Sequence, residues 1–191
     1  MLEKILEWDR STFIYLNNLG IEEYDGLWNG ITTFSNWTPL FIAVGLLLLL
    51  KYPRKNAIGM LLTFGLMLLV VTAAMYLTKE WVQRLRPNND ETINLLIRMV
   101  RRPSDYSFFS GHAATSFSIT TLAVLYLKDK FKPIWLMYIW PLLFSFSRIY
   151  VGVHYPTDLI VGCLVGVTLA LLTHKLYVRV IEPYLASVRP L

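Results

Sequence analysis

Long apolar stretches, separated by short charged or proline-containing segments, dominate the pattern of hydrophobic and polar positions along this chain. The stretches cover residues 31–50, 57–77, 113–127, 134–150 and 159–178. A helix needs roughly 20 predominantly apolar residues to cross the hydrocarbon core of a bilayer. The pattern therefore predicts an all-α fold, an integral membrane helical bundle with about five transmembrane helices.

Residues 1–30 carry a different pattern, in which apolar positions recur at helical spacing opposite charged ones. The apolar positions are Leu2, Ile5, Leu6, Phe13, Leu16 and Leu19, and the charged ones are Glu3, Lys4, Glu7 and Arg10. Such an amphipathic helix is expected to lie on a membrane interface instead of spanning the bilayer. Charged residues interrupt every apolar run in this segment, so we expect no signal peptide and take the first span as the insertion signal.

The composition agrees with one membrane-embedded domain over residues 1–191. Hydrophobic residues make up 55% of the chain, more than a typical soluble domain contains. The single cysteine, Cys163, lies in an apolar stretch, which excludes an intrachain disulfide and a cysteine-based metal site. The formal net charge of +5 is distributed over separate loops and helix ends instead of forming a basic stripe, so we expect no nucleic-acid binding.

Basic residues between the apolar stretches predict the orientation of the chain. They are Lys51, Arg54 and Lys55 in one loop, Lys128, Lys130 and Lys132 in another, and Lys175 and Arg179 after the last stretch. Residues 1–25 are net acidic by contrast. Because loops rich in lysine and arginine stay in the cytoplasm, we expect the N-terminus outside and the C-terminus inside a cytoplasmic (inner) membrane.

Three polar blocks fall at the predicted outward ends of the helices and carry the side chains that phosphoryl transfer requires. Without a metal ion, fixed cations must balance the charge of a phosphate, and Lys79, Arg86 and Arg148 can supply them. A nucleophile, a neighbouring carboxylate and a proton donor are also needed. The side chains that can fill these roles are His112, His154 and Asp158.

The three blocks resemble, in order and spacing, the signatures of the type-2 phosphatidic acid phosphatase superfamily. They read Lys79-x6-Arg86-Pro87, Ser110-Gly111-His112 and Ser147-Arg148-x5-His154-x3-Asp158. Phe109 stands where that family usually has proline, which concerns the local turn and not the groups that face a phosphate. The resemblance implies a helical membrane core and a phosphatase that uses neither a metal nor another cofactor.

The resemblance also implies a role for each of these residues. His154 would be the nucleophile and form a phosphohistidine, while Asp158 would hold the other ring nitrogen of His154. His112 would be the general acid that protonates the leaving group and later assists the attack of water. The residues that bind the substrate phosphate would be Lys79, Arg86, Ser110, Gly111 and Arg148.

The local sequence predicts how these side chains are held. The helix that begins in the second apolar stretch is expected to run past Lys79 until Pro87 ends it, which would place Lys79 and Arg86 on one helical face. Ser110 can cap the next helix as well as donate to a phosphate. Pro156 fits the start of a further helix.

Other polar residues have less defined roles. Residues 88–108 mix polar and apolar positions and predict an active-site loop with a short amphipathic helix, a candidate lid. Four arginines outside the signatures would mostly contact solvent or lipid headgroups, although some could bind a second phosphate. They are Arg84, Arg98, Arg101 and Arg102. His174 is assigned no role.

The complete pattern predicts an integral membrane phosphatase that hydrolyses a lipid phosphate at the outer, periplasmic face. Undecaprenyl pyrophosphate is the first candidate, because additional arginines suit a diphosphate, and phosphatidylglycerophosphate, phosphatidate and lipid A phosphates are alternatives. Vanadium haloperoxidases share this set of site residues but are soluble proteins, and the apolar stretches of this chain argue against membership of that class. A lipid-phosphate carrier is a non-enzymatic alternative that would not need both histidines and Asp158. The expected partners are the lipid substrate and the bilayer, and the oligomeric state is open.

Overall fold

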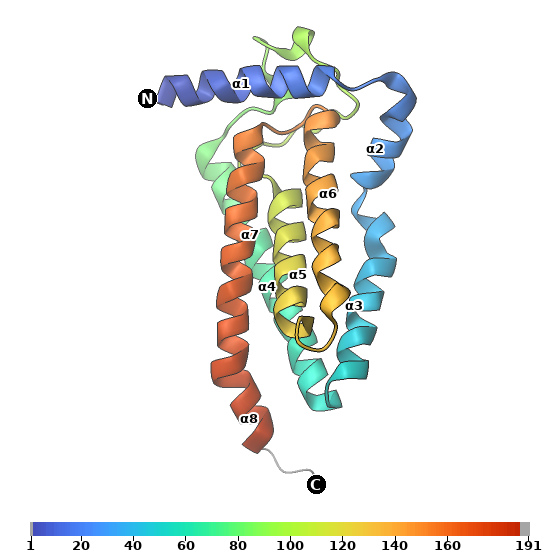
Figure 1. Cartoon of the computed structure of the whole chain (residues 1–191). Coiled ribbons are helices and arrows are strands. Elements are labelled where there is room, and N and C mark those ends of the chain that lie inside the picture. The colour runs from blue at the N-terminus through green and yellow to red at the C-terminus, as the bar shows by residue number, and fades with distance from the viewer. Residues whose placement is uncertain (1, 188–191) are drawn as a thin grey trace.

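The computed structural model describes residues 2–187, which form an elongated helical bundle that contains no β-strand within this range (Figure 1). The helices are α1 (Leu2–Asn18), α2 (Asp25–Ile31), α3 (Thr38–Lys51), α4 (Arg54–Val82), α5 (Gly111–Leu127), α6 (Ile139–Tyr150), α7 (Pro156–Leu176) and α8 (Glu182–Ser187). Helices α3 to α7 run along the bundle, and α1 lies across one end. The predicted all-α fold is confirmed, while residue 1 and residues 188–191 of the predicted domain lie outside the described residues.

Helix α5 is largely buried among the other helices, although its sequence is rich in serine and threonine. Several of its hydroxyls find partners inside the bundle. Ser116 and Ser118 donate to the carbonyl oxygens three residues earlier, at 3.2 and 2.9 Å, and the Thr121 hydroxyl lies 3.0 Å from that of Tyr138. Because paired hydroxyls avoid the cost of burying an unsatisfied polar group, these residues are compatible with the centre of the bundle.

Helices α5 and α7 approach each other closely because α7 presents glycines to α5. A Cβ atom on Gly162 would lie 2.6 Å from the carbonyl oxygen of Ser110, and one on Gly166 would lie 2.3 Å from that of Ala114. Small residues at this spacing allow two helix backbones to pack directly against each other in membranes. The contact sets the start of α5 beside the start of α7, where the Ser110 N–H donates to the carbonyl oxygen of Asp158 at 3.0 Å.

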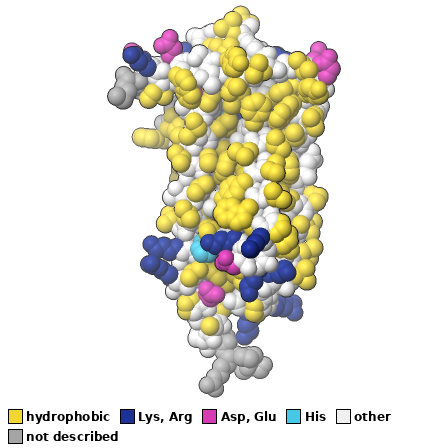
Figure 2. All heavy atoms as spheres, in the orientation of Figure 1, with side chains coloured by type: hydrophobic (Ala, Val, Ile, Leu, Met, Phe, Trp, Pro, Cys, Tyr) yellow, Lys and Arg dark blue, Asp and Glu magenta, His cyan; other side chains and the backbone are white. Residues whose placement is uncertain are grey.

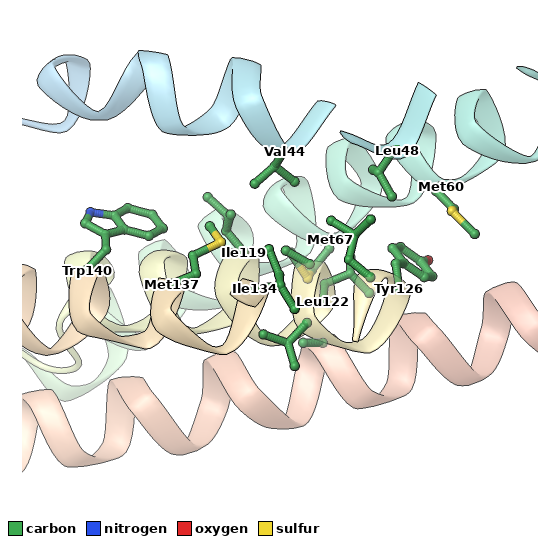
Figure 3. Close-up of a cluster of buried hydrophobic side chains, with 14 of the residues drawn as sticks. Val44, Leu48, Met60, Met67, Ile119, Leu122, Tyr126, Ile134, Met137 and Trp140 are labelled. Carbon is green, nitrogen blue, oxygen red and sulfur yellow. The ribbon is translucent and has the colours of Figure 1, made fainter. Parts of the chain in front are cut away.

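An apolar core fills the space between α3, α4, α5, the segment that precedes α6 and the start of α6 (Figure 3). It contains Val44, Leu48, Met60, Met67, Ile119, Leu122, Tyr126, Ile134, Met137 and Trp140. Hydrophobic side chains also cover the outer surface along the length of the bundle, as Figure 2 shows for one face. Many large apolar residues are more than half exposed there, among them Leu46, Leu62, Leu69 and Leu164, which suits a surface that contacts lipid.

Three segments are long and apolar enough to cross a membrane, namely Phe34–Lys51, Arg54–Asn89 and Pro156–Ser187. Helices α5 and α6 are shorter, with 17 and 12 residues, and a 3-10 segment, Lys132–Tyr138, extends the path before α6. These two helices still run alongside the others in Figure 1. The expectation of about five transmembrane helices therefore stays a prediction.

The predicted N-terminal helix is present as α1, and its inner side is more polar than expected. Phe13 packs edge-on against the ring of Tyr155, with centroids 5.4 Å apart. Asn17 is fully buried, and its side-chain amide donates to the carbonyl oxygens of Ile149 and Tyr150 at 2.9 and 3.1 Å. Helix α1 is thus fixed to the ends of other helices, and the short helix α2 that follows it was not predicted.

Helix α4 ends earlier than predicted. Its last residue is Val82, and Gln83 adopts a left-handed conformation with φ 51°, which turns the chain out of the helix before Pro87 is reached. Arg86 is extended, so the prediction that Lys79 and Arg86 share one helical face was wrong. Residues 88–108 contain only short 3-10 turns and no α-helix, so the predicted amphipathic helix is also wrong, while the lid role stays a prediction.

Candidate active site

The three sequence signatures meet beneath α1, at the end of the bundle that lies opposite the exposed basic loops around residues 51–55 and 128–132. The last turn of α4 carries Lys79, the first turn of α5 carries His112 and the last turn of α6 carries Arg148. The segment between α6 and α7 carries His154. Most of the predicted site side chains are less than one-tenth exposed, namely Lys79, Arg86, Ser110, Arg148, His154 and Asp158.

The turn between α6 and α7 brings Arg148 and His154 together. Gly152 has φ +83°, a left-handed conformation that glycine adopts without strain, and a Cβ atom there would lie 2.5 Å from the carbonyl oxygen of Arg98. The turn is closed by the Val153 N–H, which donates to the carbonyl oxygen of Arg148 at 3.1 Å. The spacing of five residues between Arg148 and His154 in the signature is therefore the number of residues that this turn needs to bring the two side chains together.

His154 and Asp158 form a buried pair. The Nδ1 atom of His154 lies 3.3 Å from Oδ2 of Asp158, and the same oxygen accepts the backbone N–H of Tyr155 at 3.0 Å. Nε2 of His154 lies 3.0 Å from Nη1 of Arg86. Because Arg86 can only donate, Nε2 carries the lone pair and Nδ1 carries the hydrogen that Asp158 accepts.

The environment of His154 favours a neutral imidazole. Burial, together with the positive charges of Arg86 and Arg148, holds the pKa of His154 well below its usual value. A neutral ring with its lone pair on Nε2 is the form that attacks an electrophile. The structure thus presents a nucleophilic nitrogen to a group of cations.

The cations converge on a residue that was not predicted, Asp105 in the loop before α5. Nζ of Lys79 lies 2.5 Å from Oδ2 of Asp105, and Arg86 donates to both carboxylate oxygens, from Nε at 3.1 Å and Nη2 at 3.0 Å. Partial burial alone would raise the pKa of Asp105, but the hydrogen bonds and charges of Arg86 and Lys79 outweigh it and lower the pKa to about 2. An anion with two oxygens therefore occupies the place where these cations meet.

The guanidinium of Arg148 pairs with the protein through one nitrogen and has a buried nitrogen without a partner. Its Nη1 donates to the hydroxyl of Thr32 at 2.5 Å, while its buried Nε has no hydrogen-bond partner within residues 2–187. A buried donor without a partner costs free energy, which an anionic ligand at this position would recover. Thr32 lies just after α2, so the unpredicted helix α2 supports a residue of the site.

His112 lies near the cations of the site. Its ring stacks on Phe144, with centroids 4.8 Å apart. Burial and the positive charge of Arg148 lower the pKa of His112 to about 2, so its ring is neutral. Ser110 caps α5 as predicted, with the Ala113 N–H 3.5 Å from its hydroxyl, so Phe109 does not prevent this turn. Gly111 also serves packing, because a Cβ atom there would lie 2.1 Å from the sulfur of Met75.

Three of the four additional arginines bind other parts of the chain, which corrects the prediction that they mostly contact solvent or headgroups. Arg98 donates to both oxygens of Asp25, at 2.8 and 3.0 Å, and Arg101 binds the Asn29 side chain at 2.6 Å. Arg84 contacts Asp158, at 2.8 Å. These arginines are therefore already engaged by protein groups; Arg102 is exposed.

Two residues beside the site were missed although the sequence held a signal for one of them. Asp9 is fully buried and contacts Arg84, and it lies three residues after Leu6 and four before Phe13 on the apolar side of the N-terminal helix. A charged residue in an apolar stripe indicates a buried partner. Asp105 gave no such signal, because its partners come from distant segments.

Comparisons with known proteins identify the family of the chain. The family model of the PAP2 superfamily matches residues 60–182. A lipid A 4'-phosphatase of Porphyromonas gingivalis is 30% identical over 99% of this chain and 81% of that protein. An undecaprenyl-diphosphatase of Sulfolobus acidocaldarius is 35% identical over 68% of this chain and 58% of that protein. The crystal structure of a transmembrane PAP2 type phosphatidylglycerolphosphate phosphatase from Bacillus subtilis superposes with a TM-score of 0.71 and 23% identity, covering 93% of this chain and 88% of that one.

Proposed function

Because the chain belongs to the PAP2 superfamily and is a membrane lipid phosphatase, we propose that it acts without a metal, through a phosphohistidine on His154. The observation that carries this proposal is the geometry of His154. Its Nδ1 is bound to Asp158 and its Nε2 faces the side chain of Arg86. A neutral nucleophile beside fixed cations is what attack on a phosphate anion needs.

In the first step, the lone pair on Nε2 of His154 attacks phosphorus, and the bond from phosphorus to the leaving oxygen breaks. The leaving oxygen takes a proton from His112, whose pKa the negative charge of the substrate phosphate must first raise, and Asp158 stabilises the positive charge that develops on the ring of His154. In the second step, water attacks phosphorus and gives a proton to His112. The bond from phosphorus to nitrogen then breaks, which releases inorganic phosphate and restores neutral His154.

The non-bridging oxygens of the substrate would take the place of the Asp105 carboxylate. Lys79 and Arg86 already hold two carboxylate oxygens at hydrogen-bond distance, and Arg148 has its unpartnered Nε to offer a third oxygen. Fixed donors of this kind stabilise the charge that spreads over the equatorial oxygens of the transition state. Ser110 and Gly111, at the N-terminus of α5, would supply further donors.

An apolar cavity beside the site supports a lipid substrate. It has a volume of about 230 Å³ and is lined by residues of α3, α4 and α5, including Phe41, Gly45 and Phe64. Phe34 also lines it, and the Phe34 ring lies 6.1 Å from that of Phe144, the ring on which His112 stacks. A lipid whose phosphate lies at the site could place part of its tail here and leave the rest in the bilayer.

The proposed orientation places this site outside the cytoplasm, at the periplasmic face of the inner membrane. The site lies under α1, and basic loops occupy the other end of the bundle. Cytoplasmic loops are enriched in lysine and arginine, so the end with residues 51–55 and 128–132 would face the cytoplasm.

Undecaprenyl pyrophosphate is the first proposed substrate, since the Sulfolobus relative is named for it. The argument from extra arginines no longer supports it, because Arg84, Arg98 and Arg101 bind protein groups. The 4'-phosphate of lipid A is the second candidate, because the Porphyromonas relative covers nearly the whole chain.

The test is phosphate release by the purified protein in detergent with EDTA present, using undecaprenyl pyrophosphate, lipid A, phosphatidylglycerophosphate and phosphatidate. We expect release from at least one lipid and, after an alkaline quench, a phosphoenzyme that His154→Ala lacks. A requirement for a divalent ion, or a phosphoenzyme that persists in His154→Ala, would overturn the mechanism. The preferred lipid identifies the substrate class.

A further inference from the structure

We propose that Arg84 and Asp9 form a positioning pair that holds the carboxylate of Asp158 in its working orientation. This inference rests on the function proposed above. Nη1 of Arg84 donates to Oδ1 of Asp158 at 2.8 Å, and Nη2 donates to Oδ2 of Asp9 at 2.6 Å. One guanidinium therefore bridges the proposed catalytic aspartate and a residue of α1.

The bridge completes the set of contacts around Asp158. Oδ2 receives Nδ1–H of His154 and the backbone N–H of Tyr155, whereas Oδ1 receives Arg84. Because Arg84 engages the oxygen that His154 does not use, it prevents rotation of the carboxylate away from the imidazole.

Arg84 is itself held in place from several sides. Its guanidinium lies over the ring of Tyr155, 3.9 Å from the centroid, and Nη1 also donates to the hydroxyl of Thr157 at 2.8 Å. A planar guanidinium that stacks on a ring and donates to two carboxylates has a single orientation, which lysine cannot reproduce. The position of Arg84 therefore transmits any movement of Asp9 to Asp158.

Asp9 connects this network to α1. It is fully buried, and its carboxylate accepts the Thr157 backbone N–H at 2.8 Å and the Thr157 hydroxyl at 2.5 Å. The N–H groups in the first turn of a helix lack partners within the helix, so Asp9 acts as an additional cap for α7. Through these hydrogen bonds, helix α1 is connected to the first turn of α7, which carries Asp158.

The energetics favour a role in geometry over one in stability. Asp9 and Asp158 are fully buried, and the side chain of Arg84 is 18% exposed. Taking charges out of water is costly, so a buried network of this kind contributes little net stability compared with an apolar replacement. What such a network provides is one fixed arrangement of its members, and here one member is the proposed partner of the nucleophile.

The test compares the kinetics of Asp9→Asn, Arg84→Gln and the double variant with those of Asp25→Asn. Asp25→Asn is the matched control, because it makes the same change and removes an ion pair with Arg98 elsewhere in the N-terminal segment. We expect kcat to fall by about 10- to 100-fold in each network variant, while KM stays within about twofold, since the phosphate-binding cations are untouched. The control should keep its kcat.

The kcat of the double variant gives the sharper test, because it shows whether the effects of the two single substitutions are independent. If Asp9 acts through Arg84, the double variant should be no slower than Arg84→Gln alone. Arg84→Lys, which keeps the charge and is the least disruptive change, should have an intermediate kcat. Thermal unfolding of each variant checks that the protein remains folded, so that a lower kcat is not caused by loss of folded protein.

Two results would overturn the inference. One is a kcat in Asp9→Asn and Arg84→Gln equal to that of the wild type, and the other is a multiplicative loss in the double variant. A wild-type protein that releases phosphate from none of the lipids would instead contradict the proposed function.

Discussion

At the end of the bundle under α1, the charged side chains of the candidate site are mostly buried and hydrogen-bonded to one another, whereas the basic side chains of the loops at the opposite end are exposed. Arg86, Asp105 and His154 belong to one connected network at the first end. Lys51, Arg54 and Lys128 at the second end are exposed to solvent. Buried charges are costly and persist where they have partners and chemistry to perform, while exposed ones determine solubility and orientation. Equivalent substitutions at the two ends should therefore have very different effects.

The largest difference is expected between the two histidines at opposite ends of the molecule. His154→Ala should lower phosphate release to below about 1% of the wild-type rate, because it removes the proposed nucleophile. Binding of a phosphorylated lipid should persist, since Lys79, Arg86 and Arg148 remain. His174→Ala, at the other end against Tyr126, is the control and should retain normal turnover. Substantial turnover in His154→Ala would assign the nucleophile to another residue.

Asp158→Asn should lower kcat by about 10²- to 10⁴-fold, because an amide can neither stabilise the developing imidazolium nor reliably select its tautomer. Steady-state kinetics on the preferred lipid measure this change. Asp129→Asn makes the same substitution in the exposed basic loop at the other end and should leave kcat unaltered. A near-normal rate in Asp158→Asn would reduce its role to capping α7.

The two ends should also lie on different sides of the membrane. After Cys163 is replaced by serine, a cysteine introduced as Arg102→Cys should react with a membrane-impermeant thiol reagent in intact cells. Lys130→Cys, which is also exposed but lies at the basic end, should react only after the cells are broken. The reverse pattern would place the site in the cytoplasm and favour a role in phospholipid synthesis.

A smaller effect is expected from Asp105→Asn, which removes the negative charge that now lies between Lys79 and Arg86. The KM for the lipid phosphate and the inhibition constant of vanadate should both fall, on the order of 3- to 10-fold, because the phosphate no longer competes with a carboxylate. Glu91→Gln, in the same loop, is the control. A rise in KM would mean that Asp105 helps the substrate by orienting the cations.

The smallest effect concerns pH. Burial and nearby cations hold the pKa of His154 well below its usual value of 6.5, so from about pH 7 to 5 the unfolded chain takes up a proton that the folded chain does not. The free energy of unfolding should therefore decrease as the pH falls through this range, and His154 should contribute at most about 1.4 kcal/mol per pH unit, in addition to the contribution of His112, whose pKa is also lowered. Thermal unfolding of His154→Asn should show a shallower pH dependence, and an unchanged slope would exclude His154 as its source.

Local signals in the sequence were sufficient for several parts of this structure. The start of α7 was indicated by Pro156, and Ser110 indicated the start of α5, because caps and first turns depend on neighbouring residues alone. The end of α4 was not indicated by the local sequence, since glutamine has no intrinsic preference for the left-handed conformation that Gln83 adopts. Tertiary contacts decide its position.

The candidate site likewise contains residues that the local sequence predicts and residues that only tertiary contacts bring together. The spacing of the signatures identified the histidines and cations that meet, because each signature lies within one turn or helix end. The partners of Asp105 and Arg84 were not predicted, since each pair joins segments that are far apart in the sequence. Asp9 could have been recognised as buried from its neighbours, but no pattern in the chain identifies Arg84 as its partner.

The hydrogen bonds that Thr157 donates to Asp9 connect the first turn of α7, which carries Asp158, to helix α1 and so to the headgroup layer in which α1 is expected to lie. Helix α1 lies across the end of the bundle, where lateral pressure and headgroup packing act on an amphipathic helix. Bilayers of different thickness or curvature would tilt such a helix differently and pull on the first turn of α7. Turnover measured in micelles and in nanodiscs of defined lipids should consequently differ for reasons unrelated to substrate supply.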